Sequence, residues 1–400
     1  MVTRFYNGAL CDKGVLKENT TLYVDETTGV ILDGSKINVN NVDKHIDLQG
    51  NVLAPGFLDI QNNGVYGFNF AIMEGSERQF TDDYQKAMTR YMSTGVTGVC
   101  PTVISADKTT YQKVLPHLGA TRLSSQCDSL GVHCEGPFIS LNKKGCHNPK
   151  HLIEDATKVT LADVYGNDPK EIKVVTVAPE IPGIFDQIPL MCQKGWIVSV
   201  GHTTASYQQA SCAVEKGATL ITHLYNAMPA PHHRKAGVVG TITLAGDKGS
   251  PTPYFGMIAD GIHIDKTMVA MAYRAAPGKC ILVTDTMHLY GLPDGVYNWD
   301  GQVLRKKGAV VLVDGTETLA GSATDLPSCL RNLMEWADLS LAEAVACVTN
   351  HPANVLDLEK KKGYLDPGCD ADLVVLNRSG YVQKVFKLGN PVTGSKASKL

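Results

Sequence analysis

Three features are scarce in this sequence, and each scarcity excludes a class of protein. Charge of one sign is not in excess, because 37 Lys and Arg stand against 40 Asp and Glu, for a formal net charge of -3. That balance argues against a broad basic surface for nucleic acid. Apolar runs such as 280–283 and 373–376 fall far short of the ~20 residues that cross a bilayer. The first eight residues lack a charged segment followed by an apolar one, which is the pattern of a secretory signal. We therefore expect a soluble, cytoplasmic protein without nucleic-acid or membrane partners.

The sequence also gives no sign of cysteine pairing. The 11 cysteines are odd in number and scattered, with no CxxC pair, which argues against a disulfide framework and against a thiolate zinc cluster. Hydrophobic residues make up 44% and charged residues 19% of the 400 residues, as in an ordinary globular protein with a large core. An α/β barrel uses about 250 residues, which leaves room for one smaller domain.

A repeated pattern from residue 51 to about 286 predicts alternating strands and helices. Short β-branched and aliphatic runs predict strands at 52–60, 98–104, 130–133, 174–178, 196–200, 219–221, 254–258 and 280–284. Apolar residues at helical spacing and helix stop signals predict helices at 81–94, 204–216 and 265–276, and a further helix from the capping box at Ser340 to about Asn350. Eight such units close most economically into a (β/α)8 TIM-like barrel, which we place at residues 51–361.

The two ends of the chain have a different pattern. Residues 1–50 and 362–400 contain short strand-like pieces separated by Gly, Asn and Asp. Neither segment is long enough to hold a core alone, so we expect both to form one small composite β-sandwich domain. The polar tail from Thr393 is expected to be mobile.

Polar side chains follow most of the predicted barrel strands. Catalytic groups of such barrels lie at the carboxyl ends of strands, and histidine and carboxylate are the types that bind metals and move protons. The residues at these ends are Gln61, Asn63, Pro101, Thr102, His133, Glu135, Glu180, His202, His223, Asp260, His263 and Asp285.

One carboxylate and two imidazoles among them suit a single divalent metal. Glu135, His202 and His223 come from different strand ends and leave an open position for water. A single histidine at such a place is more often a structural residue held by hydrogen bonds, so the set carries the inference. Asp285 follows an apolar run, where a desolvated carboxylate can act as general base, and its alternative role is to cap the next segment.

Three further segments are candidates for substrate binding. The basic loop at 231–235, with Arg234, and His263 suit a phosphate or carboxylate, although a solvated basic loop is the alternative reading. His147 is placed to polarise a carbonyl. Residues 319–322 are expected to form a small-residue turn that lets the backbone approach a sugar.

Motifs in a fixed order resemble one enzyme family. They are Pro-Gly-Phe-Leu-Asp at 55–59, His-x-Glu-Gly-Pro-Phe at 133–138, Lys-Gly-x-His-Asn at 144–148, Gly-His-Thr at 201–203, Thr-His-Leu-x-Asn-Ala-Met at 222–228, Asp-Gly-x-His at 260–263, Leu-Ala-Gly-Ser at 319–322 and the closing Gly-x-Leu-x-Pro-Gly-x-Asp-Ala-Asp-Leu-Val-Val-Leu at 363–376. The set resembles the N-acetylglucosamine-6-phosphate deacetylase family of the amidohydrolase superfamily over nearly the whole chain.

This resemblance implies a reaction and a cofactor. It implies hydrolysis of the acetamide of N-acetyl-D-glucosamine 6-phosphate to D-glucosamine 6-phosphate and acetate, in amino-sugar catabolism. One divalent metal ion, most often Zn²⁺, would be held by Glu135, His202 and His223. A water activated by that metal would be the nucleophile, and Asp285 would be the general base and acid.

The resemblance also implies a set of substrate contacts and a homodimer in which subunits share the phosphate site. His147 would be both catalytic and substrate-binding. The other substrate-binding residues would be Gln61, Cys146, Asn226, Ala227, Arg234, His263, Leu319, Ala320 and Gly321.

Two departures refine this expectation. Many amidohydrolases carry HxH at the first strand end and bind a second metal, whereas Gln61-Asn62-Asn63 offers only amide side chains, so we expect one metal per subunit. Lys235-Ala236 departs from the acidic residue and proline that often follow the arginine in this family.

The sequence argues against two alternative functions. A cyclic-amide hydrolase of the dihydropyrimidinase type needs HxH and a bridging carboxylated lysine, and neither is apparent in this sequence. A catalytically dead barrel would lack metal ligands or the general base, and none of these is missing here.

Overall fold

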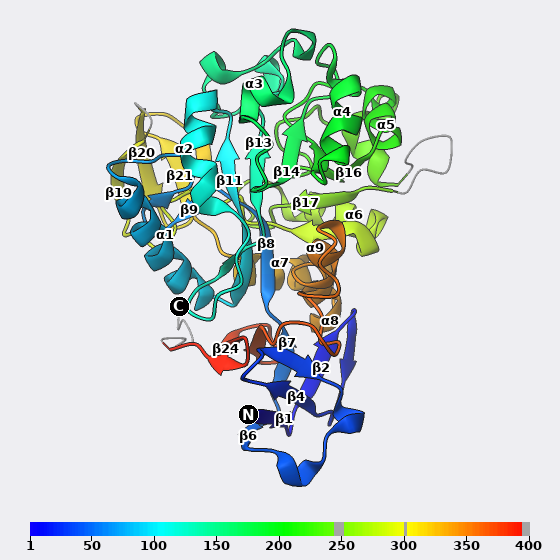
Figure 1. Cartoon of the computed structure of the whole chain (residues 1–400). Helices are drawn as coiled ribbons and strands as arrows, with labels where there is room; N and C mark the ends of the chain where they lie inside the picture. The colour runs from blue at the N-terminus through cyan, green and yellow to red at the C-terminus, as the bar shows by residue number, and fades with distance from the viewer. Residues whose placement is uncertain (244–251, 300–301, 394–400) are drawn as a thin grey trace.

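The computed structural model describes residues 1–243, 252–299 and 302–393, and it confirms the predicted parallel barrel (Figure 1). Residues 394–400 of the expected mobile tail lie outside the described residues. One edge of β11 (Val96–Ile104) pairs in parallel with β8 (Phe57–Asn62), and its other edge pairs with β12 (Asp128–Ser129) and then β13 (Val132–Glu135). From β13 the parallel order continues through β14 (Ile172–Val177), β15 (Ile197–Val200), β16 (Ala218–Ile221), β17 (Tyr254–Met257) and β18 (Cys280–Leu282).

The barrel closes between its first and last strands without a regular ladder. The N–H of Asp285 donates to the carbonyl oxygen of Gln61 at 2.9 Å, and the N–H of Asn63 donates to that of Thr286 at 2.9 Å. These bonds lie just beyond the carboxyl ends of β8 and β18. The seam of the barrel therefore coincides with the end at which the sequence places the candidate site.

Helices surround the barrel, and the predicted ones are present with slightly different ends. They are α1 (Glu77–Met92), α2 (Lys108–Leu118), α3 (Leu161–Tyr165), α4 (Ile184–Gln193), α5 (Tyr207–Glu215), α6 (Lys266–Ala275), α7 (Leu326–Ala337), α8 (Leu341–Ala346) and α9 (Asn350–Val355). Ser340 and Glu343 form the predicted capping box of α8. Pro352 does not end the helical stretch as expected, because it lies in the first turn of α9, where an N–H has no helical acceptor to lose. No described helix is long and apolar enough to span a membrane.

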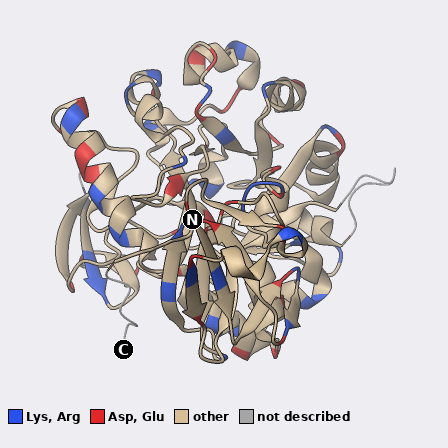
Figure 2. Cartoon of the chain, turned by 60° about the horizontal axis from the view of Figure 1, so that its bottom comes forward, with Lys and Arg blue, Asp and Glu red and all other residues tan. Residues whose placement is uncertain are grey.

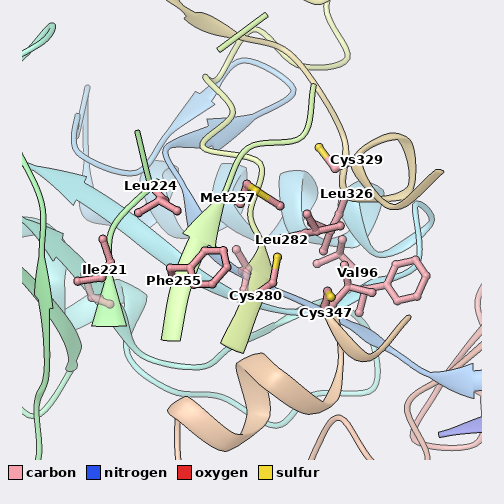
Figure 3. Close-up of a cluster of buried hydrophobic side chains, with 14 of the residues drawn as sticks. Val96, Ile221, Leu224, Phe255, Met257, Cys280, Leu282, Leu326, Cys329 and Cys347 are labelled. Carbon is pink, nitrogen blue, oxygen red and sulfur yellow. The ribbon is translucent and has the colours of Figure 1, made fainter. Parts of the chain in front are cut away.

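Apolar side chains fill the layer between barrel strands and outer helices. Figure 3 shows Phe255, Met257 and Leu282 from the strands facing Leu326 and Cys329 of α7, and all five are fully buried. The 11 cysteines are free thiols, most of them buried, as the composition indicated. The strand ends are therefore held on a closely packed scaffold.

Segments from both chain ends form two further sheets. One has the order β5 (Val30–Leu32), β4 (Leu22–Asp25), β1 (Val2–Tyr6) and β6 (Lys44–Asp47). The other has the order β25 (Asn390–Pro391), β24 (Val382–Lys387), β23 (Leu373–Leu376), β7 (Val52–Pro55), β2 (Ala9–Asp12) and β3 (Val15–Lys17). The rings of Phe5 and Phe386 meet edge to face at 5.0 Å within their shared core. The domain boundaries at 50 and 362 stay predictions.

The first predicted barrel strand proves to be two strands. β7 belongs to the end sheet and only β8 belongs to the barrel, so the prediction of one strand over 52–60 was wrong. Gly56 lies between them, and a Cβ there would stand 2.1 Å from the Thr97 Oγ1 atom. Only glycine allows the backbone to lie this close to the Thr97 side chain. At this point the chain passes directly from one sheet to the other.

A sheet that the sequence did not predict covers one side of the barrel mouth. It contains β19 (Gly295–Trp299), β20 (Gln302–Lys307), β21 (Val310–Val313) and β22 (Leu319–Ser322). The expected turn at 319–322 was wrong, because this segment pairs with β21 as a strand. A Cβ at Gly321 would lie 2.8 Å from the Met287 side chain, so the small residue permits close packing. The hairpin β9 (Gly64–Val65) and β10 (Phe68–Asn69) lies after β8.

Buried charges join the barrel to the end sheet. Figure 2 shows Lys and Arg interspersed with Asp and Glu along the ribbon. The Lys362 Nζ atom lies 2.7 to 2.8 Å from carboxylates of Asp128, Asp370 and Asp372. Lys387 Nζ lies 2.7 Å from Asp128 and 2.9 Å from Asp372. Arg122 pairs with Asp370, so three cations balance three anions, and we call these six residues the ionic cluster.

Candidate active site

A cavity of about 680 Å³ opens at the carboxyl ends of the barrel strands. It gathers most of the residues that the sequence singled out. Those lining it are Glu135, Cys146, His147, His202, His223, Asn226, Ala227, His263, Asp285, Leu319, Ala320 and Gly321. Gln61 and Arg234 are not among the lining residues, and their places are described below.

Glu135, His202 and His223 converge at the base of this cavity. The Glu135 Oε1 atom lies 3.1 Å from His223 Nε2 and 3.3 Å from His202 Nε2, and the two Nε2 atoms are 3.0 Å apart. All three side chains are buried. One ligand atom from each lies within 4.8 Å of the others, which is the spacing of a set that can hold one metal ion.

The donor chemistry of these residues fits a divalent cation. The His202 Nδ1 atom lies 2.7 Å from the Lys143 carbonyl oxygen, which can only accept, so Nδ1 carries the ring proton and Nε2 presents a lone pair. His223 points its own Nε2 at the same place, and its Nδ1 has no partner among the described residues. Two imidazole nitrogens and a carboxylate oxygen are the ligand types of a catalytic zinc site.

Glu135 is held in its ionised form. Burial alone would raise its pKa, but the adjacent imidazoles of His147, His202 and His223 outweigh burial and hold the pKa well below its usual range. The Glu135 carboxylate, with a smaller contribution from Asp285, outweighs the opposing effect of burial and raises the pKa of His223. Gln61, predicted as a substrate contact, is buried and donates from Nε2 to the Glu135 Oε1 atom at 2.8 Å. Its amide therefore orients a candidate ligand.

Asp285 faces the same cavity from the end of β18. The Asn63 Nδ2 group donates to its Oδ1 atom at 2.8 Å. Burial, reinforced by the negative charge of Glu135, raises the pKa of Asp285 to about 6. A carboxyl group with such a pKa can accept and return a proton near neutral pH.

His147 is positioned by Ser105. The Ser105 backbone N–H donates to the His147 Nδ1 atom at 3.2 Å, so the ring proton belongs on Nε2, which lies 3.7 Å from Glu135 Oε2. Burial lowers the pKa of His147 to about 4, which keeps the ring neutral at neutral pH. A neutral ring with its N–H toward the cavity is a hydrogen-bond donor for a carbonyl oxygen.

The candidate anion-binding residues divide into two groups. Asn226, Ala227 and His263 line the cavity, and the His263 Nδ1 atom lies 2.8 Å from Asp260 Oδ2. Arg234 is exposed on the loop whose His232 and Lys235 form a short bridge. Its guanidinium is thus outside the cavity of its own chain.

Other polar residues at the strand ends support the backbone. The His133 ring lies 3.1 Å from the Ile60 carbonyl oxygen through Nδ1 and 2.7 Å from Thr176 Oγ1 through Nε2. Glu180 accepts from the Thr203 hydroxyl and from the Thr204 N–H. These side chains hold the loops that carry His202 and its neighbours.

Backbone conformation aims the functional side chains. His202, His223, Ala227 and Asp285 have φ values of 47°, 28°, 48° and 46°, in the left-handed region that non-glycine residues seldom adopt. Three of them are candidate ligands or base, each directly after a barrel strand. Such strain persists where the surroundings fix it, and it clusters at functional sites.

Sequence reasoning missed three residues of the cavity region. Ser105 follows β11 directly, so the rule applied to the other strand ends would have found it. His288 and Trp299 line the cavity, and Trp299 comes from the unpredicted sheet. No sequence motif marked either residue.

Three carboxylates of the ionic cluster have the spacing of a second metal set, but they serve another purpose. Asp128, Asp370 and Asp372 place ligand atoms within 4.8 Å of one another. The Lys362 ammonium occupies the space between them at 2.7 to 2.8 Å from each. The carboxylates are thus neutralised by lysine.

Comparison with known proteins assigns the family. The model of the Amidohydrolase family matches residues 52–392. The chain belongs to the amidohydrolase family. Within this amidohydrolase, the predicted resemblance is confirmed by curated relatives named N-acetylglucosamine-6-phosphate deacetylase. The one from Caenorhabditis elegans is 34% identical over 98% of this chain and 94% of its own, and the human one is 37% identical over 93% and 91%.

The fold of this amidohydrolase is shared with solved structures. The crystal structure of N-acetylglucosamine-6-phosphate deacetylase from Pasteurella multocida superposes with a TM-score of 0.84 at 27% identity, covering 99% of this chain and 100% of that one. The prediction of an enzyme that hydrolyses an amide bond is confirmed by the family and by these relatives. Glu135, His202 and His223 are its candidate metal ligands.

Proposed function

We propose that this amidohydrolase hydrolyses the acetamide of N-acetyl-D-glucosamine 6-phosphate to D-glucosamine 6-phosphate and acetate. The observation that carries the proposal is the convergence of three ligand atoms beside Asp285 and His147 in one cavity. Relatives that bear the name of this reaction support it. We place the activity in the cytoplasm and in amino-sugar catabolism.

One divalent ion, most often zinc for such a ligand set, would be held by Glu135, His202 and His223. When bound, it would lower the pKa of a water molecule and polarise the substrate carbonyl. Asn63 stands at one of the two histidine positions of the HxH motif that binds a second metal in other amidohydrolases, and it donates a hydrogen bond to Asp285. Amide side chains therefore occupy the place where a second ion would need ligands. We therefore propose one ion per subunit.

Asp285 would move the proton. Its carboxylate takes a proton from water as the water oxygen attacks the acyl carbon, and Asn63 fixes the carboxylate in place. The same proton then passes to the sugar nitrogen as the carbon–nitrogen bond breaks. A pKa of about 6 lets one group perform both transfers near neutral pH.

His147 would hold the acyl oxygen. Its Nε2–H group points into the cavity because Ser105 occupies Nδ1. The N–H group stabilises the negative charge that develops on that oxygen. The ring is neutral near pH 7, so it donates this hydrogen bond without transferring a proton to the substrate.

The phosphate would be bound by two subunits. Asn226, Ala227 and His263 line the cavity of their own chain, whereas Arg234 is exposed and does not line it. An arginine supplied by a second copy would complete the anion site with paired hydrogen bonds. We therefore propose a homodimer, with the other cavity-lining residues, Cys146 and Leu319 to Gly321, contacting the sugar.

The deciding experiment is acetate release from N-acetylglucosamine 6-phosphate by purified protein. Turnover should disappear after treatment with a chelator and return when one equivalent of zinc per subunit is added. Metal analysis should give about one tightly bound ion per subunit. A folded, zinc-loaded protein without acetate release would contradict the proposal.

A further inference from the structure

A second cavity adjoins the active site. It has a volume of about 280 Å³ and shares part of its wall with the larger cavity. The shared residues are Asn69, Ala71, Ile104, Asn148 and Trp299. Nothing in the reaction proposed above uses this space, which we call the side chamber.

The side chamber lies across the barrel from the proposed phosphate site. It is built on the last residue of β11, Ile104, on residues 105–106 after it, and on Thr110, Lys113 and Val114 of α2. The strand order places β11 second and β16 sixth around the barrel, so the two strands face each other across it. Asn226 and Ala227 follow β16. A substrate held by its phosphate near β16 therefore extends toward the side chamber.

The acyl group is the part of the substrate directed there. Ser105 lines the side chamber and also holds His147, which would bind the acyl oxygen. The amide nitrogen remains with the sugar on the phosphate side. An acyl chain leaves the planar carbonyl carbon on the side away from the nitrogen. With its oxygen on His147 and its nitrogen on the phosphate side, such a chain would extend toward Ser105 and the side chamber.

The chemistry of the side chamber favours a chain that ends in an oxygen acceptor. Its walls combine apolar side chains, with Met73, Ala106 and Val114 among them, and polar ones such as Thr110 and His151. Trp299 lies in the wall that the two cavities share and is only 7% exposed. Lys113 is exposed where it lines the chamber and adds a positive charge. A carboxylate at the end of an acyl chain would be attracted to this ammonium group.

We propose, building on the deacetylase function, that the side chamber admits N-acyl groups longer than acetyl on the same sugar phosphate, and favours a chain that ends in a carboxylate. The reaction is unchanged in its balance. The carbon–nitrogen bond breaks, water supplies oxygen to the acyl carbon and a proton to the amine, and the product is a longer carboxylic acid. The chamber thus sets the acyl specificity of the enzyme.

The test compares N-acetyl- and N-succinyl-glucosamine 6-phosphate with the zinc-loaded wild-type enzyme. We expect kcat/KM for the succinyl compound within about tenfold of that for the acetyl compound, because added methylenes and a carboxylate have room and partners. A larger loss for the succinyl compound, with the acetyl compound turned over normally, would overturn the inference. Failure of the acetyl compound itself would instead count against the proposed function.

Two variants locate the effect in the side chamber. Ala106→Phe fills it without touching the larger cavity, so kcat/KM for the succinyl compound should fall at least about tenfold while acetyl turnover stays within about twofold. Lys113→Gln, at an exposed position that does not endanger folding, should lower succinyl turnover but not that of the uncharged N-butyryl compound. Equal losses for all compounds in both variants would show that the chamber does not read the acyl group.

Discussion

Asp285 shows how one residue depends on its surroundings for a chemical role. Its carboxyl group is buried next to an ionised Glu135, and those two facts raise its pKa to about 6. Its other neighbour, Asn63, donates a hydrogen bond that fixes the Oδ1 atom. An aspartate elsewhere on the surface has neither feature. The role belongs to the position as much as to the residue type.

Replacing Asp285 by Asn should therefore remove turnover and little else. We expect kcat to fall by about 10² to 10⁴, because the amide cannot accept a proton. Zinc content, measured after gel filtration, should stay at the wild-type level, since the candidate ligands are unchanged. Asp168→Asn, the same change at an exposed position, is the matched control. A variant at Asp285 with nearly wild-type kcat would show that another group is the base.

At the scale of secondary-structure elements, the candidate site lies on loops that each follow one barrel strand. His202, His223 and Asp285 follow β15, β16 and β18 and share a left-handed backbone that directs their side chains into the cavity. Hydrogen bonds such as that from the His202 Nδ1–H to the Lys143 carbonyl oxygen then fix the rings. The fold thus accepts local strain in order to bring distant side chains together.

The strain at His202 can be measured by comparing two variants that both lack the imidazole. In the metal-free protein, His202→Gly should exceed His202→Ala in free energy of unfolding by about 1 kcal/mol, because only glycine adopts φ of 47° without cost. Urea denaturation provides the measurement. At His133, inside a regular strand, the order of the same pair should reverse. Equal stabilities at position 202 would mean that its backbone is not strained.

Elements could be predicted from the sequence where local pattern decides them. The runs before Glu135, His202 and His223 are apolar and β-branched, so the strands and their polar ends were visible. The break at Gly56 was not, because β7 and β8 are both fully buried and no charged or polar side chain interrupts residues 52–58. Which sheet each half joins depends on a contact with Thr97, which is distant in sequence.

The unpredicted sheet at 295–322 explains the residues that were missed. Its strands carry local signals that sequence reasoning overlooked, namely the β-branched run at 310–313 and the Asp-Gly pair at 300–301. Trp299 reaches the cavity only because β19 pairs with β20 and the whole sheet packs over the barrel mouth. Predicting that placement requires the tertiary contacts of Met287 and Ser322, which no local pattern records.

At the scale of the whole molecule, the ionic cluster joins the barrel to the sheet formed by both chain ends. Asp128 belongs to β12, while Asp372 and Lys387 belong to the C-terminal segment. Lys387 is 1% exposed in its side chain and Asp128 is fully buried. Buried ion pairs contribute little net energy when complete, but an unpaired member is costly.

Removing one member should therefore destabilise the molecule strongly. Lys387→Met should lower the free energy of unfolding by about 3 to 5 kcal/mol, because Asp128 and Asp372 lose a partner in a buried site. The control is Lys13→Met, whose pair with Asp366 is about half exposed, and its loss should lie within about 1 kcal/mol. Similar losses for both variants would show that burial of the cluster is not important.

The cluster also predicts a dependence on pH. Burial alone would raise the pKa of Asp372, but Lys362 and Lys387 outweigh it and hold the pKa at about 2, below the value in the unfolded chain. The stability from this group is present above about pH 4 and is lost as the pH falls toward about 2. Circular dichroism should show acid unfolding in this range, and Asp372→Asn should weaken the dependence. An unchanged acid transition in that variant would contradict the assignment.

A shared phosphate site predicts complementation between inactive subunits. Asp285→Asn and Arg234→Ala proteins should each be nearly inactive, but mixing them under exchange should restore about a quarter of wild-type activity, since half the dimers are mixed and each has one intact site. Analytical ultracentrifugation of the mixture checks that dimers form. If mixing restores nothing, Arg234 does not act across the subunit boundary.

The seam of the barrel links function to the order of folding. The Asn63 side chain and Asp285 meet although 222 residues separate them, and the Asp285 backbone closes the ring of strands at the same point. Contacts between such distant residues have the greatest loop-closure entropy to overcome, and they form late. A refolding chain would form its helices well before Asp285 reaches its position in the active site. Recovered activity therefore reports completion of a contact between residues that are far apart in the sequence.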